Sequence, residues 1–334
     1  MVARNRTSDE VLAAKRGVQD ADATTAQKAE MLMEMAMGIQ QKPKSPDDLL
    51  AAVDLYEEAL ELCGAQDALL AARVRARMAT ALMSIPSEDT GYLARARDEM
   101  EVALATVSAE GKDEEIAEAE MNLGLICQNL AGAGKGKIQD AIGAYQRALR
   151  VFDKAQFPAE FAILQNNLAT AFLSIPFSDE SGKMREALAV QSFEEGLRVV
   201  NLIDHPTEYA MLQNNLGNAL QYASSSHRVE NGFRALEAYD EALKVRNEAD
   251  TPGEFANTVA NKANCLSNLP DHPEAPEKGN KNNMIKALGL YHEARKIFVA
   301  VGEMQKAQMV ADAAAELQGL ISSGGSSDQF QSLQ

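Results

Sequence analysis

The stretch Glu208–Leu220, E-Y-A-M-L-Q-N-N-L-G-N-A-L, recurs in close or weakened form along most of the chain and decides its fold. Within it, Ala210, Asn214 and Gly217 follow one another at four- and three-residue steps. This spacing keeps side chains on one face of an α-helix. Pro206, just upstream, suits the first turn of a helix, where its missing N–H would have no intrahelical acceptor. The stretch therefore predicts a helix.

Copies of this helix lie on both sides of it. One copy, E-F-A-I-L-Q-N-N-L-A-T-A-F, occupies residues 160–172, and a more degraded one occupies residues 254–266. Two weaker copies surround Arg77 and Asn122, and Glu34-Met35-Ala36 fits as the first member. The equivalent positions are 34, 77, 122, 167, 215 and 261, which recur every 43 to 48 residues. Self-similarity at such a period is typical of stacked-repeat proteins.

A second pattern, Ala-x3-aromatic-x2-Ala-Leu, lies between the copies of the first helix. Positions i, i+4 and i+7 share one helical face, so each copy presents a large side chain between two small ones. A helix with such a face must be buried against neighbouring helices, which again indicates stacking. The large residues are Tyr56, Met100, Tyr145, Phe193, Tyr239 and Tyr291, and each follows an alanine by four residues.

These two patterns predict an all-α fold, an α-α superhelix of about six helix pairs with a C-terminal closing helix at Glu303–Ile321. We expect residues 1–23 to form an N-terminal arm with a short helix from Thr7, and residues 24–321 to form one elongated repeat domain. The Gly/Ser-rich residues 322–334 are expected to be a disordered tail. The proline-rich connection 269–283 is the longest, and we expect it to project.

The net charge of −17 and the isoelectric point near 4.8 argue against nucleic acid as the main partner, because a phosphate backbone requires clustered Lys and Arg. No apolar run approaches the roughly 18 residues that cross a bilayer. The first 24 residues are too polar and acidic for a secretory signal. We therefore expect a soluble, cytoplasmic protein without membrane insertion.

Residues that could carry catalysis or hold a metal are scattered along the chain. The histidines stand singly, without H-E-x-x-H or other metal spacing, and the glycine-rich A-G-A-G-K-G-K at 131–137 lacks the spacing of a phosphate-binding loop. The cysteines show no C-x-x-C spacing and are expected to be buried thiols: Cys63, Cys127 and Cys265. We predict no enzymatic activity, no metal site and no cofactor.

The repeats resemble tetratricopeptide repeats, whose pattern is W-x2-L-G-x2-Y…A-x3-F…P over 34 residues. Here Leu216-Gly217 with Leu220 corresponds to the first part, and Ala235-x3-Tyr239 to the second, whereas the tryptophan and the final proline are missing. The longer period is similar to that of kinesin light chains and of bacterial multi-repeat proteins, whose first helices carry an A-x-x-x-N-N-L-A/G run. The resemblance covers roughly residues 24–302.

The resemblance implies a superhelix whose first helices line a concave groove that binds peptides or proteins. Asparagines in the repeats would then lie along the groove, where a carboxamide can both donate to and accept from a peptide backbone. The alternative is that these amides satisfy one another or a neighbouring helix end. The residues concerned are Asn122, Asn166, Asn167, Asn214, Asn215 and Asn261, with Thr170, Asn218 and Asn264 three residues further on.

Two arginines, Arg73 and Arg77, stand one helical turn apart in the second repeat and are also groove candidates. They could clamp a carboxylate of the partner. Because Glu30 and Glu34 occupy the matching positions one repeat earlier and Glu118 one repeat later, an inter-repeat row of ion pairs is the alternative.

Two functions fit this sequence. The first is a non-enzymatic adaptor or assembly factor that captures an extended peptide or protein segment in its groove. The second is a structural or regulatory scaffold subunit, which uses its outer surface while the groove stays empty or filled by the chain itself. The partner and the oligomeric state are left open.

Overall fold

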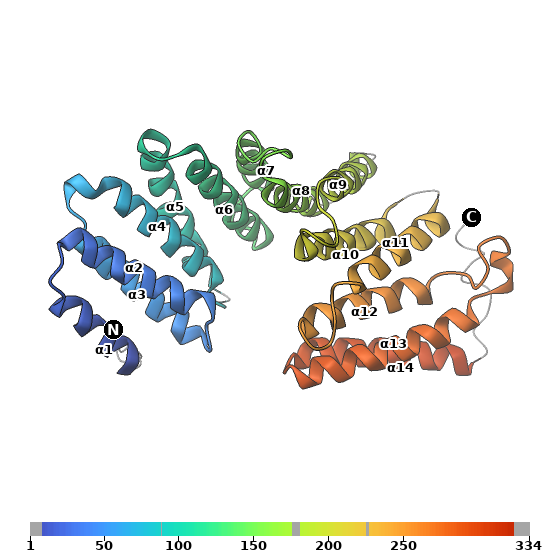
Figure 1. The fold of residues 1–334 in the computed structure, drawn as a ribbon. Coiled ribbons are helices and arrows are strands. Elements are labelled where there is room, and N and C mark those ends of the chain that lie inside the picture. The colour runs from blue at the N-terminus through green and yellow to red at the C-terminus, as the bar shows by residue number, and fades with distance from the viewer. Residues whose placement is uncertain (1–8, 88, 176–180, 225–226, 324–334) are drawn as a thin grey trace. The chain divides into compact units, whose positions relative to one another are not determined.

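The computed structural model describes residues 9–87, 89–175, 181–224 and 227–323 (Figure 1). These residues form fourteen α-helices and two short 3-10 helices, with no β-strand among them. The predicted all-α class is confirmed. The expected helix start at Thr7 and most of the expected tail lie outside the described residues.

The chain divides into two compact units, residues 1–153 and residues 154–334. Unit 1 contains helix α1 (Asp9–Asp20) and three consecutive helix pairs. The pairs are α2 (Thr25–Gln41) with α3 (Pro46–Leu62), α4 (Ala68–Ser84) with α5 (Gly91–Glu110), and α6 (Asp113–Gly132) with α7 (Ile138–Ala148). The even-numbered helices from α2 to α12 carry the first pattern and are called first helices below. The odd-numbered helices from α3 to α13 are their partners and are called second helices.

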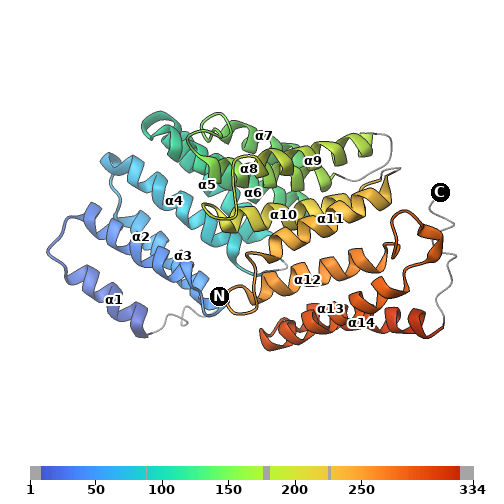
Figure 2. The same ribbon diagram turned by 45° about the vertical axis from the view of Figure 1, so that its right-hand side comes forward.

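Unit 2 contains three further pairs and the closing helix. The pairs are α8 (Pro158–Leu173) with α9 (Ser181–Leu197), α10 (Pro206–Tyr222) with α11 (Arg228–Leu243), and α12 (Pro252–Ser267) with α13 (Lys281–Ala300). Helix α14 (Met304–Ser322) packs against α13, and Figures 1 and 2 both show α12, α13 and α14 side by side. The six predicted pairs and the closing helix are thus confirmed, and the boundaries 1–23, 24–321 and 322–334 stay a prediction.

The starts of several helices follow directly from the local sequence. Thr24 forms a capping box with Gln27: the N–H of Gln27 donates to the Thr24 hydroxyl at 3.3 Å, and the N–H of Thr24 donates to Gln27 Oε1 at 2.9 Å. In unit 2, α8, α10 and α12 each begin with a proline at the first helical position. The helix start expected at Pro206 is confirmed.

Two connections between repeats share the motif N-x-x-D-x-P, which the sequence interpretation missed. In the first, Asn201 Oδ1 accepts from the N–H groups of Ile203 and Asp204, and Asn201 Nδ2 donates to the Asp204 carboxylate at 2.8 Å. Asn247 and Asp250 repeat the same arrangement before α12. Such an Asx turn fixes the chain immediately before the proline that starts the next helix.

The large residue of each second helix is buried between its small neighbours, as the sequence predicts. Tyr145 and Tyr239 are fully buried. Their rings lie against glycines of the first helix: a Cβ added to Gly124 would come within 2.3 Å of the Tyr145 ring, and one added to Gly217 within 2.6 Å of the Tyr239 ring. Only a residue without a side chain permits this contact, because an added atom would overlap the ring.

The buried hydroxyls of Tyr56, Tyr145 and Tyr239 each have an acceptor near the C-terminal end of the first helix in the same pair. The acceptors are glutamine Oε1 atoms at 2.9 Å: Gln40 for Tyr56, Gln128 for Tyr145 and Gln221 for Tyr239. Burial raises the pKa of all three phenols, so they remain neutral donors. Where the second helix carries Met100 or Phe193, which have no hydroxyl, the glutamine position holds an apolar residue, Met83 or Leu173.

Replacing Ala242 with leucine tests this packing. Ala242 is fully buried beside Tyr239, so the added atoms should overpack the helix pair and lower the free energy of unfolding by about 1–3 kcal/mol. Urea denaturation of unit 2 measures the change. The matched control is Glu237→Gln, an exposed position on the same helix, which should leave the midpoint within the experimental error. Equal midpoints for both variants would contradict the helix phase described here.

One inter-repeat contact breaks the apolar pattern. The residue seven positions after Phe193 of α9 is Val200. Val200 belongs to the same buried cluster of unit 2 as Leu212, which lies on the next first helix, α10. In the following repeat the corresponding residues are Arg246 and Thr258, and Arg246 Nη1 donates to Thr258 Oγ1 at 2.8 Å. Thr258 is fully buried, and burial lowers the pKa of Arg246. A polar pair thus stands where the other repeats are apolar.

One sequence expectation needs correction. Cys127 and Cys265 are buried, and burial raises the pKa of Cys265 to about 12, but Cys63 is only half-buried.

The connection 269–283 is fixed at its two ends. Asn283 Nδ2 donates to the carbonyl oxygen of Leu269 at 3.1 Å, and Leu269 itself is buried in the core. Residues 272–274 in the middle of the connection are exposed. Its projection stays a prediction.

No helix in the described ranges is both long enough and apolar enough to cross a membrane.

Candidate functional site

The candidate site lies on the first-helix face, which we define as the side of the first helices that carries the predicted asparagines and arginines. In unit 1, helices α2, α4 and α6 together line a hollow of about 180 Å³, called the unit 1 hollow below. Its lining includes Glu34 of α2, Arg73 and Arg77 of α4, and Glu118 and Asn122 of α6. The structure therefore brings Arg73, Arg77 and Asn122 together, although they come from two different repeats.

Both arginines of the hollow are paired with carboxylates of the next first helix. Arg73 Nε lies 2.8 Å from Glu115 Oε1, and Arg77 Nη1 lies 2.9 Å from Glu118 Oε1. The hydrogen bond from Arg73, helped by the Lys112 backbone N–H, lowers the pKa of Glu115. The inter-repeat row of ion pairs is thus present between α4 and α6, with Glu115 as an unexpected member.

The row does not extend to α2. Neither Glu30 nor Glu34 makes an ion pair with Arg73 or Arg77, all four of which lie in the described part of the chain. Glu34 lines the hollow and is exposed. Its carboxylate is therefore the one charge of the hollow without an opposite charge in contact.

A chain of hydrogen bonds anchors one wall of the hollow to the core. The buried Tyr56 hydroxyl donates to Gln40 Oε1, Gln40 Nε2 donates to Thr80 Oγ1 at 2.9 Å, and Thr80 Oγ1 donates to the carbonyl oxygen of Arg77 at 2.8 Å. The large residue of a second helix thus helps to position the arginine-bearing turn of the next first helix. Sequence inspection did not identify Gln40 as part of the site.

In unit 2 the predicted asparagines bond to one another and form a directed chain across α12, α10 and α8. Asn261 Nδ2 donates to Asn214, Asn214 to Asn215, Asn215 to Asn166, and Asn166 to Asn167, at N–O distances of 3.3, 3.0, 2.8 and 3.2 Å. Asn166, Asn167 and Asn214 are buried. This amide chain is the arrangement expected from the alternative in which the asparagines satisfy one another.

One nitrogen of the amide chain has no acceptor: Asn167 Nδ2 is buried and makes no hydrogen bond in the structure. Each of the other amides still holds a second N–H and a second acceptor lone pair, because a carboxamide offers two donors and two acceptor sites. The internal hydrogen bonds therefore leave donor and acceptor sites for a ligand, and peptide binding by these residues stays a prediction.

The three remaining candidates point to internal partners. Asn218 Oδ1 lies 2.7 Å from the Tyr239 hydroxyl and shares the single proton of that hydroxyl with Gln221 Oε1, so it supports the core. Asn264 Nδ2 donates to the Tyr222 hydroxyl at 2.6 Å, and Thr170 Oγ1 donates to the carbonyl oxygen of Asn167 at 2.9 Å. Hydroxyl groups and amides on a helix commonly bond to nearby carbonyls or aromatic hydroxyls in this way. We therefore assign them a supporting position beside the amide chain.

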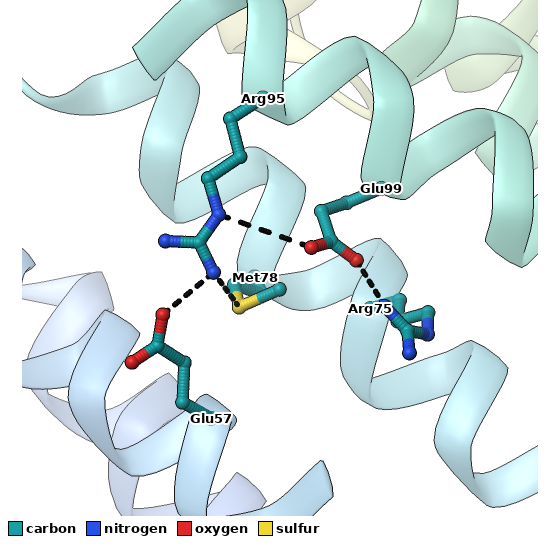
Figure 3. A network of polar contacts seen from close by, with 5 residues as sticks. All are labelled: Glu57, Arg75, Met78, Arg95 and Glu99. Carbon is teal, nitrogen blue, oxygen red and sulfur yellow. Dashed lines mark hydrogen bonds and ion pairs between the residues drawn. The ribbon is translucent and has the colours of Figure 1, made fainter. Parts of the chain in front are cut away.

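A separate ion network joins α3, α4 and α5 of unit 1 (Figure 3). Arg95 of α5 lies between two carboxylates, with its Nη2 2.6 Å from Glu57 Oε1 and its Nε 3.8 Å from Glu99 Oε1, and Arg75 bonds to the other oxygen of Glu99. Glu194 and Arg234 occupy the positions of Glu57 and Arg95 in unit 2 and pair at 2.9 Å. Because these side chains are partly exposed, we assign the network to helix positioning rather than to ligand binding.

The described residues contain no group of three or more His, Cys, Asp and Glu side chains placed to hold a metal ion.

Comparisons with known proteins concern the fold. No protein-family model matches the sequence, and no curated protein matches it. Among solved structures, a Rap protein complexed with competence and sporulation factor matches 94% of this chain and 80% of its own, at a TM-score of 0.50 and 11% identity. The chain has the fold of a tetratricopeptide-like helical repeat.

Two further structures match this repeat protein with lower scores. The apo form of RapI covers 95% of this chain and 98% of its own, with a TM-score of 0.47 and 12% identity. The TPR2AB domain of yeast Sti1, in a complex with pHSP90, covers 88% of this chain and 98% of its own, with a TM-score of 0.30 and 15% identity.

Proposed function

We propose that this repeat protein is a non-enzymatic interaction module that binds an extended peptide or protein segment on its first-helix face. The observation that carries the proposal is the unit 1 hollow, which three consecutive first helices line with charged, amide and apolar side chains. A site built from several repeats suits a ligand that runs across them. The match to a Rap protein in complex with competence and sporulation factor supports the proposal by analogy of fold.

The chemistry of the hollow also supports peptide binding. Asn122 can donate to a peptide carbonyl and accept from a peptide N–H, which would hold a backbone whatever its side chains are. Arg77 uses one nitrogen for Glu118 and has further N–H groups for a ligand. The net charge of −17 disfavours a nucleic-acid ligand at such a site.

The scaffold alternative is favoured by one observation on a second helix. Met184 and Leu188 stand one turn apart on α9, with 68% and 39% of their surface exposed. Neighbouring exposed apolar side chains of this kind can mark a contact with another protein. This alternative would use the second helices and leave the first-helix face without a partner.

Selection from a phage-displayed library of random dodecapeptides on the immobilised full chain tests the proposal. Selected peptides, labelled with fluorescein, should bind at least about thirtyfold more weakly to the Arg77→Ala/Asn122→Ala variant, since one lost hydrogen bond to a charged group and one to an amide together cost at least about 2 kcal/mol. The matched control, Met184→Ser/Leu188→Ser, should bind as the parent chain does. Weaker binding to the Met184→Ser/Leu188→Ser variant than to the Arg77→Ala/Asn122→Ala variant would favour the scaffold function. A selection that enriches no peptide would reject the proposed function.

A further inference from the structure

We propose that the unit 1 hollow accepts a basic side chain, lysine or arginine, of the bound segment. This inference rests on the proposed function and specifies the chemistry of its ligand. It also differs from the first of the two sequence hypotheses for Arg73 and Arg77, in which they clamp a carboxylate of the partner.

The charges of the hollow favour a cation. Each arginine already has a carboxylate of α6 in contact, at 2.8 Å for Arg73 and 2.9 Å for Arg77. Glu34 is left over, so the lining carries one more negative than positive charge. A ligand carboxylate would have to compete with Glu115 and Glu118 for the arginines while facing Glu34. A ligand cation would instead supply the missing partner of Glu34.

The apolar part of the lining fits the stem of a long basic side chain. Met33 and Met37 flank Glu34 on α2, and Ala76 and Ala119 face the same hollow from α4 and α6. Lysine and arginine bury their methylene stems along apolar surface and keep the charged end at a polar site. Methionine adapts its shape to such a stem.

The size of the hollow agrees with one side chain. Its volume is about 180 Å³, and a cavity of about 150 Å³ is known to hold a benzene ring. The negative field of a chain with a net charge of −17 would also favour the approach of a basic segment over an acidic one.

A double-mutant cycle on the full chain tests the inference. The probes are dodecapeptides selected from the random library, synthesised as selected and with each Lys or Arg replaced in turn by Gln. Glu34→Gln should weaken binding of the selected peptide about three- to fivefold, the range of a partly exposed ion pair, and should not weaken binding of the peptide whose interacting basic residue is already Gln. The matched control is Glu61→Gln, an exposed position on α3, which should leave both affinities unchanged.

Two further outcomes separate this inference from the proposed function. Enrichment of Lys and Arg among the selected peptides, and a shift of the selection towards Asp and Glu on the Glu34→Lys chain, would support it. Peptides that are enriched in Asp and Glu on the parent chain, or that bind equally to the parent and Glu34→Gln chains, would overturn it while the proposed function stands. If no peptide is enriched from the library, both this inference and the proposed function are rejected.

Discussion

Replacing Tyr145 with alanine is expected to lower the free energy of unfolding of unit 1 by about 3–5 kcal/mol, the usual cost of removing a large aromatic side chain from a core. Tyr145 is fully buried, and its ring fills the space above Gly124. Its loss would open a cavity between α6 and α7 and would also remove the hydroxyl that donates to Gln128 Oε1. Urea unfolding followed by circular dichroism measures the change.

The control for this experiment is Tyr222→Ala. Tyr222 is 67% exposed, so its removal should change the stability by less than about 1 kcal/mol. If both variants lost a similar amount of stability, the buried position of Tyr145 would not be the cause of its effect. An unchanged transition for Tyr145→Ala would contradict the packing of the second helices.

The second large effect is expected from the double replacement Asn167→Ala/Asn215→Ala. Removing Asn215 deprives Asn214 Nδ2 of its acceptor and Asn166 Oδ1 of its donor, and removing Asn167 deprives Asn166 Nδ2 of its acceptor. Unsatisfied buried polar groups cost about 1–3 kcal/mol each, so we expect unit 2 to lose several kcal/mol of stability. Thermal unfolding and peptide affinity should be measured on the same sample.

The paired measurement separates the two roles of the amides. Lower stability accompanied by unchanged affinity of the folded chain would assign the amides to helix positioning, whereas retained stability with weaker binding would assign them to the ligand. Asn282→Ala is the matched control, because Asn282 is exposed and its side chain makes no hydrogen bond in the described structure. Full stability together with full affinity would contradict any role for the amide chain.

Much of the fold could be predicted because the repeats depend on packing that is visible in residue size. The alternation of alanine with Tyr56, Tyr145 and Tyr239 identifies the buried face of each second helix, and the copies of the first helix give the period. The acceptors of the tyrosine hydroxyls were missed, although a signal was present. Glutamine stands six residues after the equivalent positions 34, 122 and 215, whose partner helices carry these tyrosines. An apolar residue stands six residues after positions 77 and 167, whose partner helices carry Met100 and Phe193.

The candidate site was less predictable, because side-chain hydrogen bonds depend on rotamers as well as on spacing. The sequence named Asn166 and Asn215 as candidates along the same groove, but it did not show that one amide donates to the other at 2.8 Å. Likewise, Glu118 was the one carboxylate of α6 expected in the row of ion pairs, but Arg73 pairs with Glu115, one turn earlier on α6. The long arginine side chain reaches either residue, and only the packed structure distinguishes them.

The polar pair Arg246–Thr258 has a consequence for how the repeats find their order during folding. Similar repeats can stack in the wrong sequence, and such misassembly is a characteristic failure of repeat proteins. If the second helix α11 docked on the first helix of another repeat, Arg246 would face Leu212 or Leu164 in place of the Thr258 hydroxyl. A guanidinium buried against an aliphatic side chain without a hydrogen-bond acceptor is strongly unfavourable. The two polar residues, in a seam that is apolar at the corresponding positions of the other repeats, thus favour docking of this junction on its own neighbour over docking on another repeat.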